Sequence, residues 1–351
     1  MARKAFLKYV SLMMLILQMV LTVFTFIGLF GGSTHPSGNT AAAMCVYVLP
    51  FLICLNVFLL LYWLIKKEWF IGILPFLGII CSIPYLLTLV NPIGIITQQS
   101  NTPGVKVATY NVAMFGRQAS GFIAHDIFAA IKQEGVDILC IQEYNDENGD
   151  RKNSDTYKEY FPYMAYGNKD MVIYSRYPIA DSGNIPFENT NNSAMWADVK
   201  IKKKTVRIFN VHLQTTGFNR TVYKAAKQEA QGNEVETNKL LGSIYGNYTV
   251  GMVVRASQAD EVAREISASP HPLIVCGDFN DVPYSYVYHT MKGDLKDGFR
   301  EAGRGWASTY RGGKAVRIDY IFHDESIDIL SYYKRKMTYS DHFPVFIKLA
   351  L

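Results

Sequence analysis

Three long apolar stretches without a charged side chain open the chain and restrict what its first third can fold into. They run from about Val10 to Phe30, from Ala41 to Ile65, and from Trp69 to about Val90. A helix needs about 20 residues to cross the hydrocarbon core of a bilayer, so each stretch is long enough to span a membrane. A cleaved signal peptide is the alternative for the first stretch, but its apolar run is too long and two more spans follow. The sequence therefore predicts a membrane domain over residues 1–97 with three transmembrane helices.

The basic residues predict the orientation of these helices. The positive-inside rule places loops rich in Lys and Arg in the cytoplasm. The loop 31–40 has neither residue, whereas five basic side chains precede the first span or separate the second from the third: Arg3, Lys4, Lys8, Lys66 and Lys67. The N-terminus and the second loop are then cytoplasmic. Everything from about Ile95 onward lies outside the cytoplasm, which is the periplasmic side if the membrane is a bacterial inner membrane.

Two features mark the end of the membrane domain. Pro75 and Pro84 lie inside the third stretch, where a proline is tolerated better than in a soluble helix and predicts a kink. The polar segment 98–104 follows and ends in Pro103-Gly104. We interpret this segment as a linker to a second domain over residues 105–351.

The second domain differs from the first in its charge. The whole chain carries 35 Lys and Arg against 30 Asp and Glu, and the excess lies almost entirely in residues 1–97. The remainder is nearly neutral, so it shows no electrostatic footprint for tight nucleic-acid binding. The five cysteines form neither a disulfide framework nor a Cys/His metal spacing, and we interpret them as small buried hydrophobes.

Strand-like and helix-like patterns are mixed along residues 105–351, which predicts an α/β domain. Helical spacing covers residues 122–134 and 255–267. Residues 214–250 are polar and partly helical, and we interpret them as an insertion at the rim of a site. Apolar or alternating segments predict strands at 105–111, 136–143, 171–175, 194–201, 205–213, 273–278 and 317–322.

The apolar run 273–276 is the most informative of these strands, because it stops at Gly277-Asp278-Phe279-Asn280. An extended chain puts Asp278 and Asn280 on the same side and turns Phe279 away. A carboxylate and an amide at this position suit the binding of a hard cation, a water or a phosphate oxygen. Taken alone, the same residues are equally those of an ordinary turn.

Side chains of the same kinds occur at the ends of other predicted strands. Strand ends on one edge of a layered protein converge, so we expect these side chains to form one site. Each residue by itself has an ordinary structural interpretation, as a surface carboxylate, a hydrogen-bonded histidine at a strand end or a capped turn. The recurrence of such residues at several strand ends argues for a site. The set consists of Asn111, Glu143, His212, Asp278, Asn280, Asp319 and Asp341-His342.

Oxygen ligands dominate this set. Glu143, with Asn111 and with Asp341 as a further candidate, gives a thiol-free site that suits Mg²⁺ or Mn²⁺. Such an ion neutralises phosphate oxygens and offsets the charge that develops in a transition state. The sequence contains no Gly-x-Ser-x-Gly elbow, no His-Glu-x-x-His motif and no Walker loop, so serine hydrolases, zinc proteases and P-loop enzymes lack support.

The remaining members of the set suit proton transfer. His342 titrates near neutral pH when unperturbed, and Asp319 could orient its imidazole. Asp278 could take a proton from an attacking water, with Asn280 steering that water or the phosphate. His212 could donate to a non-bridging oxygen.

Seven motifs occur in a fixed order along about residues 104–351: Thr109-Tyr110-Asn111, Ile141-Gln142-Glu143, Ser175-Arg176-Tyr177-Pro178, Asn210-Val211-His212-Leu213, Gly277-Asp278-Phe279-Asn280, Ile318-Asp319-Tyr320 and Ser340-Asp341-His342. This ordered set resembles the endonuclease/exonuclease/phosphatase superfamily, which has the deoxyribonuclease-I-like fold. The resemblance implies a four-layer α-β-β-α sandwich, here preceded by three transmembrane helices, and Mg²⁺-dependent hydrolysis of a phosphoester.

The resemblance also implies a role for each matching residue. The metal would be held by Glu143, with Asn111 beside it and Asp341 nearby. The attacking water would be positioned or activated by Asp278 and Asn280, and Asp319 would pair with His342. The substrate and its scissile phosphate would be contacted by His212, His342, Asn280 and Arg176.

These residues are shared among nucleases, inositol-phosphate phosphatases and sphingomyelinase-type phospholipases, so they do not select a substrate. The membrane domain and the neutral charge favour a membrane-anchored phosphodiesterase or phosphatase that acts on a lipid head group or a related phosphate ester. An extracytoplasmic nuclease acting on nucleic acid is the first alternative, and an inactive binding module is the second. The bilayer is the expected partner, and no protein partner can be inferred.

Overall fold

The computed structural model describes residues 2–92, 102–113, 124–144, 154–168, 170–188, 190–215, 218–231, 236–311 and 315–350. They form two compact units. The first consists of Met1–Thr88 with Val282–His289, and the second of Leu89–Asp281 with Thr290–Leu351. Most of the predicted linker 98–104 lies outside the described residues.

The first unit is built from apolar helices: α1 (Ala2–Gly31), α2 (Thr40–Lys66), α3 (Trp69–Cys81) and α4 (Ile83–Leu89). α1 and α2 are each long and apolar enough to cross a membrane, with mean hydropathies of 2.4 and 2.6. α3 and α4 are bent by 43° and count as a third span only if the pair is taken as one. The break falls at Ser82, two residues before Pro84, whose ring excludes a regular helical hydrogen bond there.

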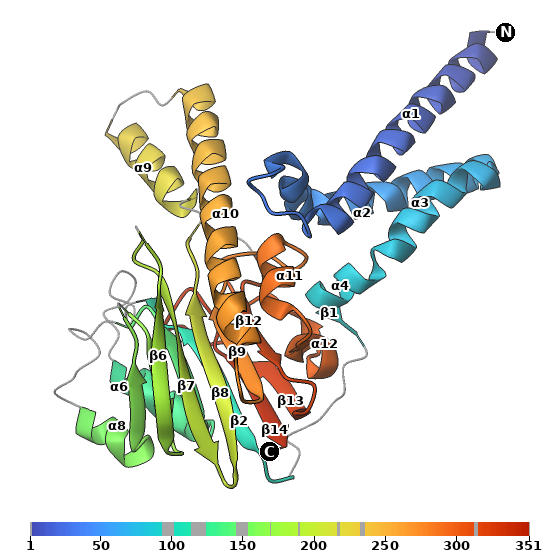
Figure 1. The fold of residues 1–351 in the computed structure, drawn as a ribbon. Coiled ribbons are helices and arrows are strands. Elements are labelled where there is room, and N and C mark those ends of the chain that lie inside the picture. Colours follow the sequence, from blue (N-terminus) through green and yellow to red (C-terminus); the bar gives the residue numbers. More distant parts are fainter. Residues whose placement is uncertain are drawn as a thin grey trace. The chain divides into compact units, whose positions relative to one another are not determined.

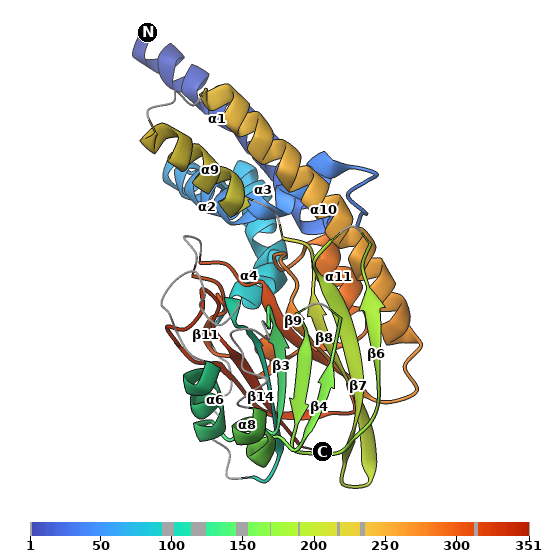
Figure 2. The ribbon, with the colours of Figure 1, turned by 90° about the vertical axis from the view of Figure 1, so that its left-hand side faces the viewer.

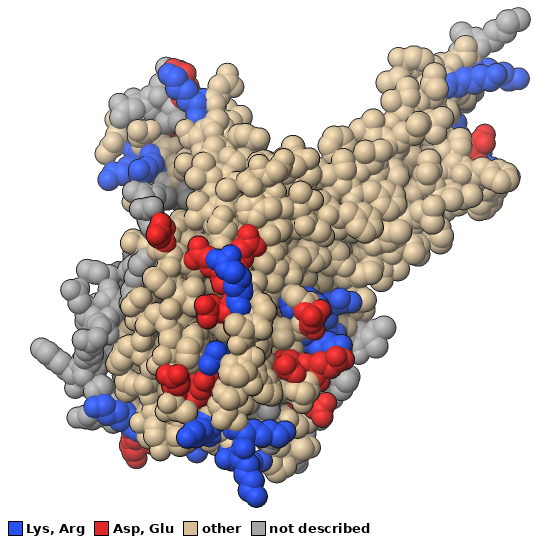
Figure 3. Space-filling model, viewed as in Figure 1, with Lys and Arg blue, Asp and Glu red and all other residues tan. Residues whose placement is uncertain are grey.

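The first unit has polar side chains between its helices and apolar side chains on its outer surface, the reverse of a soluble helical bundle. Its buried contacts include a polar cluster in which Gln18 Nε2 donates to Asn56 Oδ1 at 3.3 Å and Asn56 Nδ2 donates to Thr25 Oγ1 at 2.8 Å. Its outer surface carries large apolar side chains, such as Phe51 and Phe58, which are 72% and 69% exposed. Figure 3 shows few charged side chains over these helices. Polar contacts between helices and apolar side chains outside are typical of membrane-embedded helices.

The second unit contains two six-stranded sheets (Figures 1 and 2). One has the order β13 (Asp328–Lys334), β14 (Val345–Ala350), β2 (Val105–Asn111), β3 (Ile138–Gln142), β5 (Val172–Ser175) and β4 (Tyr163–Tyr166). The other has the order β10 (Lys296–Asp297), β12 (Asp319–His323), β9 (Leu273–Asp278), β8 (Lys204–His212), β7 (Ser193–Ile201) and β6 (Ile179–Pro186). Two central pairs, β2–β3 and β8–β9, are parallel, and the other pairings within the two sheets are antiparallel.

Successive side chains of each strand point to opposite faces of its sheet, and this alternation produces the layers. Inward-facing residues of both sheets, among them Cys140, Ile208 and Cys276, form one buried apolar cluster. The intervening residues of the first sheet, such as Leu139, pack instead with α6 (Ala124–Gln133) and α8 (Ser154–Tyr160). The second half of α10 (Thr237–Ser267) lies over the other sheet (Figure 1). The predicted α-β-β-α sandwich is thus confirmed.

The helical content of residues 214–250 is greater than the sequence indicated. α9 (Phe218–Ala230) precedes α10, and α10 begins eighteen residues before the predicted start at Arg255. The buried residues of α10 all lie at or after Gly251, so only its second half carries the apolar periodicity from which a helix can be predicted. Short elements complete the second unit: β1 (Val90–Asn91), α12 (Gly298–Ala302) and β11 (Gly305–Trp306). α11 (Tyr286–Lys292) begins in the first unit and ends in the second.

Candidate active site

Two parallel strand pairs bring four of the predicted side chains to one edge of the sandwich. In the first sheet, Asn111 at the end of β2 is paired with Gln142, so Glu143 is the next residue beyond β3. In the second sheet, His212 at the end of β8 is paired with Asp278 at the end of β9. The carboxyl ends of parallel strands share an edge, and this edge is where ligands bind in many α/β proteins.

Antiparallel neighbours contribute two further residues to this edge. Asp319 begins β12 and is paired with Asp278, and His342 precedes β14, which runs antiparallel to β2. These two residues therefore lie at the starts of strands, which corrects the prediction that every member follows a strand. Ser340 fixes His342 to β2, because its Oγ donates to Asn111 O at 2.7 Å and accepts from His342 N at 3.1 Å.

Asn111 joins the two sheets at the site. Its Nδ2 donates to Glu143 Oε1 at 3.1 Å and to Asp278 Oδ2 at 3.0 Å. Its Oδ1 accepts from Ala113 N at 3.0 Å. The amide thus presents its nitrogen to the two carboxylates and has its oxygen engaged elsewhere. This arrangement suits a residue that positions Glu143 and Asp278.

Asp278 is the most constrained carboxylate of the cluster. It is 1% exposed, and its Oδ1 accepts from Asn280 N at 2.8 Å. Burial raises its pKa to about 6, and Asp319 acts in the same direction, whereas His342, His212 and the Asn280 N–H oppose the rise. Asn280 has a φ of 52°, a left-handed conformation that Asn tolerates. Its Nδ2 donates to Leu213 O at 2.9 Å and also lies 3.3 Å from Asp278 Oδ2.

His342 is held between two carboxylates. Its Nδ1 lies 3.0 and 3.1 Å from the two oxygens of Asp319, and its Nε2 lies 3.7 Å from Asp278 Oδ2. Burial by itself would lower the pKa of the imidazole, but the two carboxylates outweigh burial and raise this pKa to about 10. The ring is therefore an imidazolium at neutral pH, with Nε2 directed toward Asp278.

His212 completes the cluster on the side of Glu143. Its Nε2 lies 3.7 Å from Glu143 Oε1 and 3.9 Å from Asp278 Oδ2. Its Nδ1 is buried, has no hydrogen-bond partner among the described residues, and lies 3.9 Å from Asp170 Oδ2. Asp170 was not predicted. It precedes β5, which runs antiparallel to β3, so the start of β5 reaches the site edge.

Arg176, which was predicted to contact the substrate, does not join this cluster. It follows β5, and its Nη1 donates to Asp137 Oδ1 at 2.9 Å at the start of β3. Six residues along β3 separate Asp137 from Glu143, or about 20 Å of extended chain. Asp341 does lie beside His342, but its side chain is exposed and Ser340 Oγ is 3.4 Å from its Oδ1.

The donor set fits a hard divalent cation. Asp278, Asp319 and His342 place polar atoms within 4.8 Å of one another, but His342 as an imidazolium has no lone pair for a metal and compensates the two carboxylates instead. The Glu143 side chain is 31% exposed, so its carboxylate is open to solvent. Its φ of 54° is unfavourable for a residue with a side chain and indicates that its placement is imposed by the surroundings.

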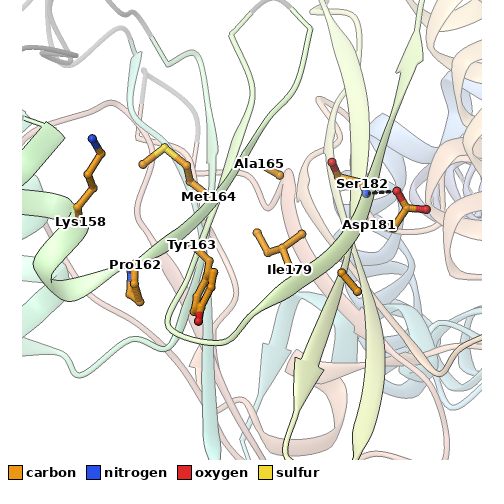
Figure 4. A pocket seen from close by; sticks show the side chains of 9 residues that line it. Lys158, Pro162, Tyr163, Met164, Ala165, Ile179, Asp181 and Ser182 are labelled. Atoms are coloured by element: carbon orange, nitrogen blue, oxygen red, sulfur yellow. Dashed lines mark hydrogen bonds between the residues drawn. The ribbon is translucent and has the colours of Figure 1, made fainter.

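A pocket of about 640 Å³ lies elsewhere in the second unit (Figure 4). It is lined by residues of the edge strands β4 and β6, such as Tyr163 and Ile179. Ile179 is paired with Val199 of β7, whereas the other end of β7, Ser193, is paired with His212. The pocket is therefore at the end of the sheet remote from the cluster.

The fold and the cluster define an α/β sandwich protein of the deoxyribonuclease-I type with acid–base side chains at one edge. Residues 108–342 match the model of the endonuclease/exonuclease/phosphatase family, so the chain belongs to this family, whose enzymes hydrolyse phosphoester bonds. Residues 10–89 match a domain of unknown function (DUF8431). No curated protein matches the sequence.

Solved structures show the same fold at low sequence identity. The catalytic domain of human Nocturnin, solved with a bound sulfate anion, is 17% identical, with 71% of this chain and 94% of that chain covered and a TM-score of 0.50. A humanised D. rerio TDP2 is 15% identical, with 70% and 99% covered and a TM-score of 0.51. An endonuclease/exonuclease/phosphatase protein from Bacteroides vulgatus is 19% identical, with 71% and 100% covered and a TM-score of 0.50.

Proposed function

We propose that the second unit is a Mg²⁺-dependent hydrolase of phosphoester bonds, anchored in a membrane by the helices of the first unit. The observation that carries this proposal is the buried charge arrangement at the site edge, where Asp278 faces an imidazolium that Asp319 keeps protonated. A base and a cationic donor side by side are what hydrolysis of a phosphoester requires from the protein.

Asp278 is the proposed general base. With a pKa of about 6 it is ionised at neutral pH but more basic than an ordinary aspartate, which favours proton transfer from water. Asn280 lies within hydrogen-bonding distance of this carboxylate and would steer the water. His342 would donate a hydrogen bond from Nε2 to a phosphate oxygen, and Asp319 orients the ring by binding Nδ1.

Glu143 would hold the cation, because its carboxylate is open to solvent and Asn111 Nδ2 keeps it beside Asp278. Mg²⁺ would supply charge neutralisation at the phosphate oxygens, and Mn²⁺ suits the same oxygen donors. Asp341 remains a further candidate ligand. His212, with Nε2 between Glu143 and Asp278, would contact a non-bridging phosphate oxygen.

The proposed anchoring is supported by α1 and α2, which are long enough to span a bilayer and expose their apolar side chains. The distribution of basic residues supports an extracytoplasmic location for the second unit. The membrane anchoring and the nearly neutral charge favour the hypothesis that the substrate is a phospholipid head group or a related phosphate ester. Nucleic acid is the alternative substrate.

The test is turnover by the purified full chain across phospholipid vesicles, soluble inositol phosphates, plasmid DNA and RNA. We expect release of a phosphorylated head group that requires Mg²⁺, stops with EDTA, and falls by about 10²–10⁴-fold in Asp278→Ala. Asp181→Ala is the matched control, because Asp181 lies on β6 near the remote pocket. Nicking of DNA or RNA in place of lipid hydrolysis would favour the nuclease. No turnover of any substrate by folded protein with Mg²⁺ bound would contradict the proposal.

A further inference from the structure

Two helical segments, residues 218–230 and 237–250, form an arm that extends from the second unit. The arm consists of α9 and the first half of α10, from Thr237 to Val250. Figures 1 and 2 show both helices projecting beyond the strands of the sandwich. No residue of this half of α10 is buried, and fourteen helical residues extend for about 21 Å. Asn247 Nδ2 donates to Thr221 Oγ1 at 2.9 Å and ties the two helices together.

The arm carries most of the exposed apolar side chains of its unit. Within the described part of the second unit, eight large apolar or tyrosine side chains are exposed, and five of them belong to the arm: Val222, Tyr223, Leu241, Tyr245 and Val250. Single exposed apolar residues are normal on a soluble surface, but their concentration on one projection marks a surface that contacts something apolar. Leu241 and Tyr245 lie one turn apart and form a stripe along α10.

The point where the chain enters the second unit carries the most exposed of these side chains. Val90 directly follows α4 and is paired with Trp306 of β11, and Ala307 N donates to Leu89 O at 2.8 Å. Trp306 is 73% exposed. A tryptophan beside the end of an apolar helix is typical of the interface between membrane and water.

The entry point and the arm both adjoin the catalytic edge. Thr309 lies three residues, or about 10 Å of chain, beyond Trp306, and its Oγ1 accepts from Asp319 N at 3.1 Å. At the root of the arm, Arg255 Nη1 donates to Gln214 O at 3.0 Å, two residues beyond His212. Trp306 and the root of the arm are thus each connected to the catalytic edge of the sandwich by a short stretch of chain.

We propose that the arm lies on the lipid surface of the membrane in which α1 and α2 are embedded. The contact is made by the stripe of Leu241 and Tyr245, with Trp306 at the same interface. In the sequence, α9 and Thr237–Val250 carry four basic residues, Arg220, Lys224, Lys227 and Lys239, against one acidic residue, Glu229. Tyrosines with lysines beside them suit the head-group region, because their apolar parts are buried and their polar ends stay in water.

Lipid contact is tested on the full chain in nanodiscs of phosphatidylcholine with a quarter of phosphatidylglycerol. Cys45, Cys54 and Cys81 are replaced by Ala, and the buried Cys140 and Cys276 are kept. An environment-sensitive fluorophore is attached at Leu241→Cys or Tyr245→Cys, and nitroxide-labelled lipid head groups act as quenchers. Ser243→Cys, exposed on the opposite face of α10, and Lys203→Cys, at the turn between β7 and β8, are the controls.

We expect lipid quenching at positions 241 and 245 to exceed that at position 203 severalfold, with position 243 between them. Equal quenching at 245 and 203 overturns the inference. A label at 245 that neither the lipid nitroxide nor aqueous iodide reaches also overturns it, because the arm is then covered by protein. Labelled variants must unfold at the temperature of the parent protein, which is expected for exposed positions.

This inference rests on the proposed membrane embedding and not on the proposed hydrolysis. A protein that fails to remain with the nanodisc during purification contradicts the embedding and the arm contact together. A protein that stays in the nanodisc with an unquenched arm contradicts the arm contact alone. Both results are independent of turnover.

Discussion

Replacing Asp319 with Asn tests whether the charge pair with His342 operates as the geometry indicates. The substitution keeps the size of the side chain and removes its negative charge, so Nδ1 of the imidazolium loses an ion pair at 3.0 Å. His342 would then titrate closer to its ordinary pKa. We expect both the stability of the second unit and its dependence on pH to change.

The magnitude follows from the pKa of His342. Its rise from 6.5 to about 10 corresponds to about 5 kcal/mol of stabilisation of the protonated folded state. Because the folded-state pKa is raised, this stabilisation is complete below pH 6.5 and is lost as the pH rises through 10. At pH 7 it is about 4 kcal/mol. Among the carboxylates that raise the pKa of His342, Asp319 has the largest effect. We therefore expect Asp319→Asn to lower the free energy of unfolding by about 2–4 kcal/mol at pH 7.

The assay is thermal unfolding of the full chain in detergent with EDTA, followed by tryptophan fluorescence at pH 7 and pH 10. For a unit of this size, the expected loss lowers Tm by roughly 5–15 °C at pH 7. At pH 10 the difference between the two proteins should shrink to a small fraction of that value, because the imidazole of the parent protein is then half neutral.

Asp198→Asn is the matched control, because it breaks a buried ion pair in the same sheet. Asp198 accepts from Arg207 Nε and Nη2 at 2.7 and 2.8 Å, and a guanidinium does not titrate in this range. Its loss of Tm should be the same at both pH values. An Asp319→Asn loss that is also the same at pH 7 and pH 10 would refute the reasoning, since the effect would then come from packing.

Three further substitutions test the remaining parts of the site. Gly277→Ala should destabilise the second unit by several kcal/mol and abolish turnover. Gly277 has a φ of 140°, and a Cβ at this position would lie 1.9 Å from Val211 O. The measurement is Tm with and without Mg²⁺. Arg255→Met should cost about 3–5 kcal/mol in thermal unfolding, because it leaves the buried Asp281 carboxylate without the guanidinium 3.3 Å away; an unchanged Tm would contradict this account. Glu143→Gln should raise the Mg²⁺ concentration for half-maximal activity at least about 10-fold. Its Tm should stay within a few degrees of the parent protein, because the side chain is partly exposed. The check is a titration of activity with Mg²⁺, and an unaltered midpoint would exclude Glu143 as a ligand.

The parts of the site that could be predicted are those carried by buried parallel strands. Every residue of β3 and β9 is buried, so each strand is a nearly continuous apolar run that stops where the polar residues begin. Glu143 and Asp278 are conspicuous for this reason. Their common edge follows once both strands are placed in the centre of a sheet.

Strand direction could not be predicted in the same way. A local pattern marks where a strand lies but not whether it runs parallel to its neighbour, and direction decides which of its ends reaches the site. β5 runs antiparallel to β3, so Asp170 before it approaches His212 and Arg176 after it lies at the far end. Residues 214–250 were predicted to be partly helical, but the start of α10 was not predicted, because its first half has no buried face and leaves no periodic apolar pattern.

α10 connects the arm to the active site. Its second half holds the loops after both parallel strands, since Arg255 reaches Gln214 O beyond β8 and Asp281 beyond β9, and Gln258 Oε1 accepts from Gln214 N at 2.8 Å. Its first half is the arm. A helix is stiff along its axis, so a force on the arm is transmitted to the loops that follow His212 and Asp278. If lipid contact acts on catalysis, the effect should therefore pass through Arg255. Arg255→Lys keeps the positive charge but cannot contact Gln214 O and Asp281 at the same time. This substitution should weaken any difference in turnover between nanodiscs and detergent.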